Sequence, residues 1–299
     1  MRNRISERII ETLLLLCAVS SIGIVFLLIG YLVFQGYPPV INWILHGFGT
    51  EFNGVDKFGM IPFIFSTAYV GVGATSLAIA IGLPTAIYLA EFSGPRIRNF
   101  IKPSMETLSG MPSIVMGIIA AFYIAPIVVA FFGTAAGYGY CVSTAWIILS
   151  IMTLPFVVSI SEDALRAVPN SYREASQGLG ATKWQTALHV VLPEAKSGIL
   201  AAVLLSLASI LGETMAVWMC IGSIQTPPIT LNPLLGSQVI STMIASNIYG
   251  LSEGGTAGQT HALLQAVYGA GLVLLTVIGI LNIVVAILVK NRSRGRNNA

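Results

Sequence analysis

The side chains that could do chemistry in this chain are few, and they lie within long apolar stretches. Glu213, followed by Thr214, is surrounded by apolar residues from 197 to 221. An ionisable group inside a bilayer costs at least about 2.5 kcal/mol and normally faces a cavity or a partner. We therefore expect Glu213 and Thr214 to lie in a polar path across the membrane or in its gate. The alternatives are that Glu213 caps a neighbouring helix or pairs with a cation of another chain.

Two prolines interrupt other apolar stretches, and each has hydroxyl side chains beside it. Pro112 lies between Ser109 and Ser113, and Pro155 follows Thr153 by two positions. A proline leaves a helix carbonyl without its donor, and nearby hydroxyls can compensate for that loss. We expect Ser109, Ser113 and Thr153 to line the same path, where they could bind a dehydrated oxyanion. The alternative is simple bending of these helices for packing.

Catalytic patterns are absent from the sequence. His46, His189 and His261 are far apart, and neither paired acids nor an HExxH pattern suggests metal chemistry. The nucleotide-binding pattern GxxxxGK[ST] does not occur, because the glycines and the lysine of segment 178–183 have the wrong spacing. We therefore expect no enzyme activity, no cofactor and no metal site, and any ATP must be bound and hydrolysed by another chain.

Composition predicts that membrane-spanning helices position these side chains. The chain is 55% hydrophobic and 9% charged, whereas soluble domains carry about 25% charged residues. A helix needs about 20 apolar residues to cross a bilayer, and a Gly-rich segment at 133–139 divides the longest uncharged stretch, 107–161. The predicted fold is an all-α integral membrane protein with six transmembrane helices. They cover 9–34, 61–90, both halves of 107–161, 197–221 and 262–289.

The basic residues predict the orientation of these helices. Fourteen of the fifteen Lys and Arg fall on one side of the six predicted spans, and Lys57 falls on the other. Cytoplasmic loops carry the excess of Lys and Arg, so we expect both termini to be cytoplasmic. The uncharged segment 231–251 competes for a seventh crossing, which would place the C-terminal cations outside. We therefore expect it to form a short helix or a re-entrant piece on the outer face.

The cytoplasmic segment between the fourth and fifth predicted spans contains two helix-start signals. Ser171 precedes Glu174, and Thr182 precedes Gln185, each with the spacing of a capping box. A Gly-rich turn separates the two predicted helices. We expect Pro193 to close the second helix and to open the next span.

An apolar stripe follows the second of these short helices. Ala181, Trp184, Leu188 and Val191 recur at helical spacing. The stripe could pack against the ends of the protein's own spans, as in any connector. It could instead present a surface to a partner outside the bilayer.

The spacing of the whole segment resembles the EAA loop of ABC importer permeases. The matching residues are Glu174-Ala175-Ser176, three residues, Gly180, nine residues, Val190, one residue, and Leu192-Pro193, with departures at Ser176 and Val190. The resemblance implies a type I ABC importer permease fold with a coupling loop at about 164–196. In that family the loop docks in a cleft of the ATPase subunit. The residues implied to couple are Glu174, Ala175, Ser176, Gly180, Trp184, Leu192 and Pro193.

Three further segments narrow the resemblance. Residues 108–115, 164–173 and the Gly-Glu-Thr-Met-Ala-Val run at 212–217 are similar to phosphate importer permeases of the Pst system, and the last favours the C-type subunit over the A-type. The implied function is import of inorganic phosphate across the cytoplasmic (inner) membrane of a prokaryote. The implied partners are a sister permease, an ABC ATPase dimer, an extracytoplasmic phosphate-binding protein and the lipid bilayer, with no nucleic acid. The implied organisation is a first span with its outer loop (1–60), a permease core (61–290) and a basic tail (291–299).

One departure from the Pst sequence pattern leaves other transported substrates as alternatives. Pst permeases commonly carry an Arg about one turn before the acid that corresponds to Glu213, whereas this chain has Ser209 and Ile210 there. A positive charge would then have to come from the partner permease, or the solute is another oxyanion such as molybdate, tungstate or sulfate. A stand-alone channel or secondary carrier is a further alternative. It would usually show an internal repeat, which is not found here.

Overall fold

The structure is a computed structural model, and it describes residues 2–46, 59–224, 227–252 and 257–296. Lys57, predicted to lie on the outer side, falls outside these ranges. In the described part, six helices are long and apolar enough to cross a membrane. This confirms the predicted all-α fold with six spans. They cover Ile10–Ile41, Ile61–Phe92, Ser113–Ala136, Val142–Arg166, Lys183–Gly212 and Leu263–Ile280.

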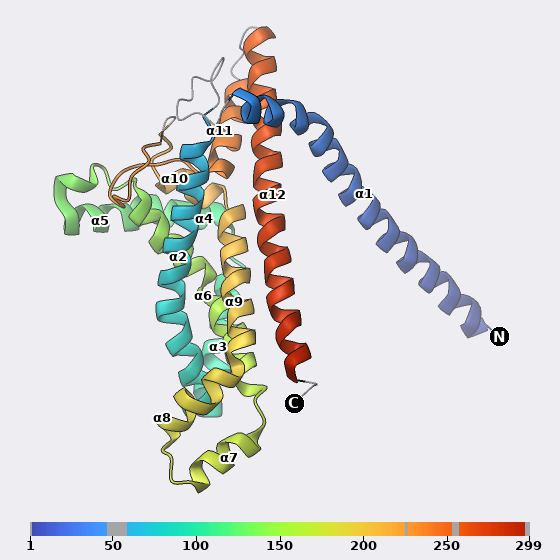
Figure 1. Ribbon diagram of the computed structural model, residues 1–299, viewed down its shortest axis with the longest axis vertical. Coiled ribbons are helices and arrows are strands. Elements are labelled where there is room, and N and C mark those ends of the chain that lie inside the picture. The colour runs from blue at the N-terminus through green and yellow to red at the C-terminus, as the bar shows by residue number, and fades with distance from the viewer. Residues whose placement is uncertain (1, 47–58, 225–226, 253–256, 297–299) are drawn as a thin grey trace.

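Three helices form the centre of the molecule, with a fourth beside them (Figure 1). They are α2 (Ile61–Ile87), α6 (Val142–Arg166) and α9 (Leu192–Gly212), and α12 (Ala257–Arg296) packs against α9. Small residues allow α2 and α6 to approach closely. Ala74 and Ala78 are fully buried, and a Cβ at Gly82 would lie 2.8 Å from Val157 Cγ1.

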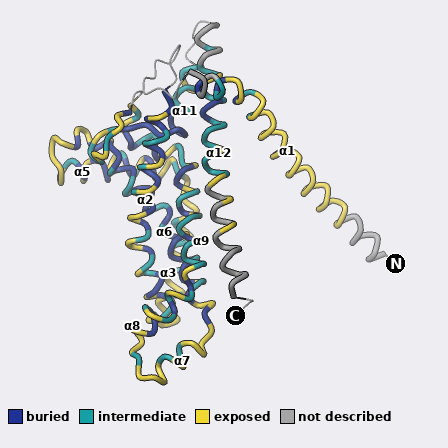
Figure 2. Tube along the Cα trace, in the orientation of Figure 1, coloured by how far each residue is buried: buried dark blue, intermediate teal, exposed yellow. Residues whose placement is uncertain are grey.

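Helix α1 (Arg2–His46) leaves this bundle at an angle (Figure 1). Its C-terminal part is joined to α12, where the hydroxyls of Tyr31 and Tyr268 are 3.2 Å apart and Trp43 packs on Gly269. From residue 10 to residue 35 of α1 no residue is buried and most are exposed, as the colouring in Figure 2 shows. This span therefore lacks a protein neighbour along most of its length within the described chain.

The predicted division of the long uncharged stretch is confirmed. Helix α5 (Ala125–Phe132) is followed by a 3-10 turn, η3 (Gly133–Ala136), and α6 begins at Val142. Gly133, Gly137 and Gly139 have positive φ, a conformation that favours glycine, so the segment reverses direction there. The preceding elements are α3 (Pro95–Ser109), α4 (Ser113–Ile119) and the π-helical turn η2 (Ala120–Ile124).

The C-terminal part of the fifth span differs from the prediction. We expected one helix over 197–221, but α9 ends at Gly212, Glu213 is extended, and a separate short helix α10 (Met215–Cys220) follows. The next helix, α11 (Ile240–Ser252), has 13 residues and lies at the end of the molecule opposite α7 and α8 (Figure 1). The short helix expected within 231–251 is thus present, and its place on the outer face stays a prediction.

At the other end, α7 (Asn170–Gly178), α8 (Lys183–Thr186) and the π-helical turn η4 (Ala187–Val191) connect α6 to α9. The capping box at Thr182 and Gln185 is confirmed by both of its hydrogen bonds. The one predicted at Ser171 is wrong, because α7 begins at Asn170 with Pro169 as its N-cap. Pro193 opens the next span as expected, but it does not close the preceding helix. Pro193 lies in the first turn of α9, where its missing N–H is tolerated, and the chain stays helical from Lys183 to Gly212.

Candidate functional site

The EAA loop, defined here as residues 170–191, forms a knob at one end of the helix bundle (Figure 1). Its turn between α7 and α8 depends on Gly180, which has a φ of +90°. Hydrogen bonds from Gly180 N to Gln177 O and from Ala181 N to Ser176 O close this turn. A Cβ at Gly180 would meet nothing within 4 Å, so the glycine is required by the backbone conformation and not by crowding.

The departure from the EAA pattern at Ser176 has a structural role. Ser176 Oγ lies 3.0 Å from Thr186 Oγ1, so the hydroxyls join α7 to α8. Thr186 is 1% exposed, and its hydroxyl would otherwise be buried beside Ala187 and Val191 in an apolar cluster. The bond therefore fixes the two short helices of the knob relative to each other.

The outer surface of the knob is unusually apolar for a loop. Leu179, at the tip, is 91% exposed, and Trp184 is 56% exposed. Glu174 and Ala175 are exposed on the preceding helix, and with the described residues Glu174 makes no hydrogen bond or ion pair. Large apolar side chains exposed together with an available carboxylate are typical of a protein interaction site.

The predicted apolar stripe is shared between two environments. Val191 is fully buried against α2 and α6, whereas Leu188 is half-buried and Trp184 points outward. Trp184 and Leu188 line an apolar groove of about 610 Å³ against the end of α2, where the Phe92 ring centroid is 6.0 Å from that of Trp184. The packing interpretation of the stripe is therefore confirmed at Val191, whereas at Trp184 the contact with a partner stays a prediction.

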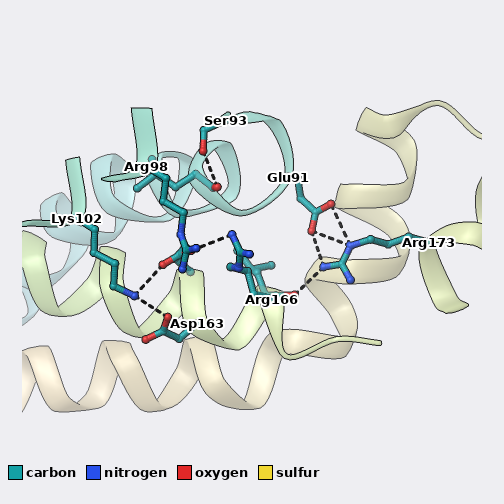
Figure 3. Close-up of polar contacts among 10 residues, drawn as sticks. Glu91, Ser93, Arg98, Lys102, Asp163, Arg166 and Arg173 are labelled. Carbon is teal, nitrogen blue, oxygen red and sulfur yellow. Dashed lines mark hydrogen bonds and ion pairs between the residues drawn. The ribbon is translucent and has the colours of Figure 1, made fainter. Parts of the chain in front are cut away.

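Arg173 ties the knob to the ends of two spans (Figure 3). Its guanidinium donates to the Glu91 carboxylate, with Nη2 at 2.7 Å from Oε1 and Nε at 3.1 Å from the same oxygen. The same group donates to Leu165 O at 2.8 Å and Val168 O at 2.6 Å, at the C-terminal end of α6. Glu91 lies in η1 (Tyr88–Phe92), the π-helical turn that ends the second span.

A second charged cluster joins α3 to the same end of α6 (Figure 3). The Glu162 carboxylate, 1% exposed, accepts from Arg98 Nε at 2.8 Å and Lys102 Nζ at 3.1 Å, with Arg166 at 3.7 Å. Lys102 also donates to Asp163 at 2.8 Å, and this bond is the main reason that the pKa of Lys102 is raised above 10.5. Buried carboxylates are stable only when paired in this way, so the cluster fixes α3 on α6.

Glu213 lies in the break between α9 and α10. Its Oε1 accepts from the backbone N–H groups of Thr214 at 3.1 Å and Ala216 at 3.3 Å, which makes the carboxylate a cap of α10. Its carbonyl accepts from Ser241 Oγ of α11 at 2.8 Å. The capping alternative is thus realised here. Glu213 and Thr214 are half-buried, and the Thr214 hydroxyl donates to Gly212 O at 3.4 Å.

The other three predicted path residues lie in different environments. Ser109 ends α3, is exposed, and donates to Glu106 O at 2.7 Å. Ser113 begins α4 on the far side of the break at Pro112 and is half-buried. Thr153 is buried, and its hydroxyl donates to Leu149 O at 2.9 Å within α6. In this conformation the Thr153 hydroxyl is therefore already hydrogen-bonded to a backbone carbonyl of its own helix.

Sequence reasoning missed three parts of this site. Leu179 had a usable signal, because an apolar residue between two glycines in a polar loop has little reason to be buried. The Glu91–Arg173 pair joins residues 82 positions apart, and no local pattern predicts it. Glu162 directly follows the uncharged stretch 107–161, and no sequence pattern marks it as a buried partner of Arg98 and Lys102.

The helical fold with six candidate spans agrees with the comparison to known proteins. A family model described as "Binding-protein-dependent transport system inner membrane component" matches residues 82–295. The chain belongs to this family. It is thus a multi-pass membrane transport subunit and not an enzyme, as its sequence predicted, and ATP is hydrolysed by a partner subunit.

Of three relatives of this permease, two are named as phosphate transport system permease proteins. The probable ABC transporter permease YqgH of Bacillus subtilis is 34% identical over 219 residues, covering 73% of this chain and 68% of the relative. PstC of Mesorhizobium japonicum is 36% identical over 185 residues, covering 56% and 57%. PstA 1 of Mycobacterium tuberculosis is 28% identical over 291 residues, covering 96% and 89%. The matches support a Pst-type permease, and they include both C-type and A-type subunits.

Solved structures support the predicted type I importer fold. A chain of the MetNI methionine ABC transporter, in a crystal form with inward-facing conformations, superimposes with a TM-score of 0.58 at 18% identity. The match covers 79% of this permease and 98% of that chain.

Proposed function

We propose that this permease imports inorganic phosphate across the cytoplasmic membrane of a prokaryote, driven by an ATPase that docks on the EAA loop. The observation that carries the proposal is the surface of the knob, where Leu179 and Trp184 are exposed beside Glu174. A loop with no partner would gain nothing from exposing these apolar side chains to water. The phosphate assignment is supported by relatives named as phosphate transport permeases, of which one spans 96% of this chain.

The proposed assembly contains a sister permease, an ATPase dimer and an extracytoplasmic binding protein. Support for the sister permease comes from the N-terminal part of α1, which stands away from α12 and has no buried residue from residue 10 to residue 35. An apolar helix bundle of a second permease fits the open angle between α1 and α12. The relatives carry both C-type and A-type names, and we assign this chain the C-type role. Both termini and the knob then face the cytoplasm.

The proposed path passes the α9–α10 break, with Glu213 and Thr214 beside it and Ser109 and Ser113 at the α3–α4 break. An isolated Glu213 carboxylate would repel an anion, so its role is gating and not direct binding. The positive charge that attracts phosphate would come from the sister permease. Thr153 joins the path only in a conformation that releases its hydroxyl from Leu149 O.

Uptake by the intact complex in proteoliposomes tests the substrate. We expect ATP-dependent accumulation of labelled phosphate, with little competition from sulfate, molybdate or tungstate. Preferred uptake of one of those anions would replace phosphate by the second candidate, an importer of another oxyanion. Flux through this chain alone, without an ATPase, would contradict the importer and indicate a channel or carrier.

Crosslinking tests the docking of the ATPase. Cysteine introduced at Trp184, in a chain lacking Cys17, Cys141 and Cys220, should crosslink to the ATPase in the intact complex. Cysteine at Phe131, exposed on α5 and far from the knob in Figure 1, is the matched control and should not. Equal crosslinking at both positions, or none at Trp184, would remove the basis for the proposed docking.

A further inference from the structure

The second span packs against the EAA loop but is not continuous with it in the chain. Helix α6 runs into the loop through residues 167–169, and α9 continues from α8 through η4 without a break. Any displacement of the knob therefore reaches α6 and α9 along the chain itself. Helix α2 has no such link, and it must follow the knob through side-chain contacts.

Those contacts are of two kinds. Ala86 and Ile87 pack against Ala187 and Val191, and Phe92 contacts Trp184. Apolar contact is non-directional and resists separation more than sliding. The second kind is the Arg173–Glu91 pair, in which two guanidinium nitrogens lie within 3.2 Å of the carboxylate.

The pair has the properties of a directional joint. The Arg173 and Glu91 side chains are 16% and 11% exposed, so water screens them less than a surface pair. A planar guanidinium with two donors on one carboxylate fixes orientation as well as distance. Its remaining donors bind Leu165 O and Val168 O, so one side chain holds the knob, η1 and the end of α6 together.

The local backbone supports the same arrangement. Glu91 lies in a π-helical turn, a rare local geometry that changes the direction of side chains at the end of a helix. Ser93 N donates to Tyr88 O at 2.8 Å, and Ser93 Oγ donates to Leu89 O at 2.8 Å, so the turn is held closed. The Glu91 carboxylate is therefore presented to Arg173 by a fixed element.

We infer that Arg173 is the positioning residue through which movement of the EAA loop is transmitted to the second span, with Glu91 as its receiver. The inference rests on the proposed docking of this loop on an ATPase. It assigns a role to two residues outside the exposed docking surface. Loss of the joint should leave docking intact and reduce the transport obtained per ATP hydrolysed.

The test uses the full complex in proteoliposomes and measures phosphate uptake per ATP. Glu91→Gln keeps the shape of the side chain and leaves the contacts within the knob unchanged. Arg173→Lys keeps the charge and loses the paired donors. We expect each variant to lower uptake per ATP by roughly 5- to 10-fold, in the range of a typical coupling between two sites. The double variant should be no worse than either single one, because both remove the same joint.

Two matched controls lie at the same end of α6. Arg166→Lys changes an arginine that is 46% exposed, and Asp163→Asn changes a carboxylate that is 62% exposed. Both should retain the uptake per ATP of the unmodified complex. The Trp184 crosslink to the ATPase is measured in every variant.

The outcomes separate this inference from the proposed function. If Glu91→Gln keeps the Trp184 crosslink to the ATPase but lowers the phosphate uptake per ATP, the Arg173–Glu91 joint is supported. A retained crosslink with an unchanged ratio overturns the joint and leaves docking in place. A crosslink lost in both variants shows that the pair only maintains the shape of the knob, which also overturns its role in transmission. Absence of the crosslink in the complex that carries the cysteine at position 184 and neither joint variant would overturn the docking itself.

Discussion

Ser176 Oγ lies 3.0 Å from Thr186 Oγ1, and this one hydrogen bond joins the two short helices of the EAA loop. Residue 176 is one of the two positions where the chain departs from the EAA pattern, and the serine there changes how the knob is held together. The buried partner is Thr186, which is 1% exposed. The two residues therefore contribute unequally to the stability of the knob.

Ser176→Ala should cost more stability than Thr186→Val. The alanine leaves the Thr186 hydroxyl buried without its partner, a loss of about 1–3 kcal/mol. Thr186→Val removes that hydroxyl, and the half-buried Ser176 can still reach water. Thermal unfolding of the solubilised permease measures both, and the double variant gives their coupling. An equal cost for both single changes would contradict the unequal roles.

Gly180→Val should impair coupling to the ATPase. A β-branched residue at a φ of +90° costs at least about 1–2 kcal/mol, so the turn between α7 and α8 would rearrange. Gly178→Val is the control, because this glycine ends α7 without a positive φ and a Cβ there meets nothing within 4 Å. Membrane insertion should be normal in both, and uptake should fall only in the first. Normal uptake by Gly180→Val would argue against the docking role of the knob.

Leu179→Asp should weaken binding of the ATPase. The side chain is 91% exposed in the isolated permease, so the change costs little stability in this chain. Burying a charge at an apolar contact would lower affinity by several kcal/mol. Leu179→Met, which conserves volume and polarity, should retain the ATPase through purification. Equal retention by both variants would place the tip outside the interface.

Glu162→Gln should destabilise the permease more than Asp163→Asn. The Glu162 carboxylate pairs with Arg98 and Lys102 and is 1% exposed. Its loss should therefore lower the free energy of unfolding by roughly 1–3 kcal/mol. Asp163 is 62% exposed and pairs only with Lys102 among the described residues, which predicts about 0–1 kcal/mol. Unfolding temperatures of the two variants in one detergent provide the comparison. The opposite order would show that Glu162 does not organise the cluster.

The pH dependence of this cluster follows from Lys102. Its pKa is raised in the folded state by the Asp163 bond, so its stabilising contribution is complete below 10.5 and is lost only as the pH rises through the raised value. The difference in unfolding temperature between the unmodified permease and Asp163→Asn should therefore stay constant from about pH 6 to 9. A difference that shrinks within that range would contradict the assignment.

Glu213→Gln should separate the capping role of Glu213 from its proposed role in gating. Glutamine keeps an oxygen for the N–H groups of Thr214 and Ala216, so unfolding should change little, whereas Glu213→Ala should cost about 0.5–2 kcal/mol. We expect phosphate uptake to fall in both variants, because both lose the charge. Full uptake in Glu213→Gln would make this residue a helix cap and nothing more.

The sequence predicted features that depend on averages or on local spacing. Six spans follow from windows of apolar residues, the reversal at 133–139 from glycines, and the cap at Thr182 from a spacing of three. It did not predict the end of α9 at Gly212, because a two-residue break disappears in an average over a whole span. Pro193 was misjudged because a proline in the first turn of a helix is compatible with continued helix.

The coupling loop shows the same limit within the candidate site. Its motif located the knob, but the contacts of Arg173 with Glu91 join segments far apart in sequence. Such a pair becomes visible only when the ends of α2 and α6 are placed side by side. The exposure of Leu179 likewise depends on which way the turn at Gly180 directs the tip.

The unbroken helical run from Lys183 to Gly212 makes the second half of the EAA loop and the fifth span a single lever. Its 30 residues correspond to about 45 Å at 1.5 Å per residue. A tilt of only about 5° at the Lys183 end would swing the Gly212 end, next to Glu213, by about 4 Å if the rod stays straight. A displacement of about 4 Å is comparable to the radius that a passage for a hydrated anion needs. A small rotation at the Lys183 end could therefore open or close a path at the Gly212 end.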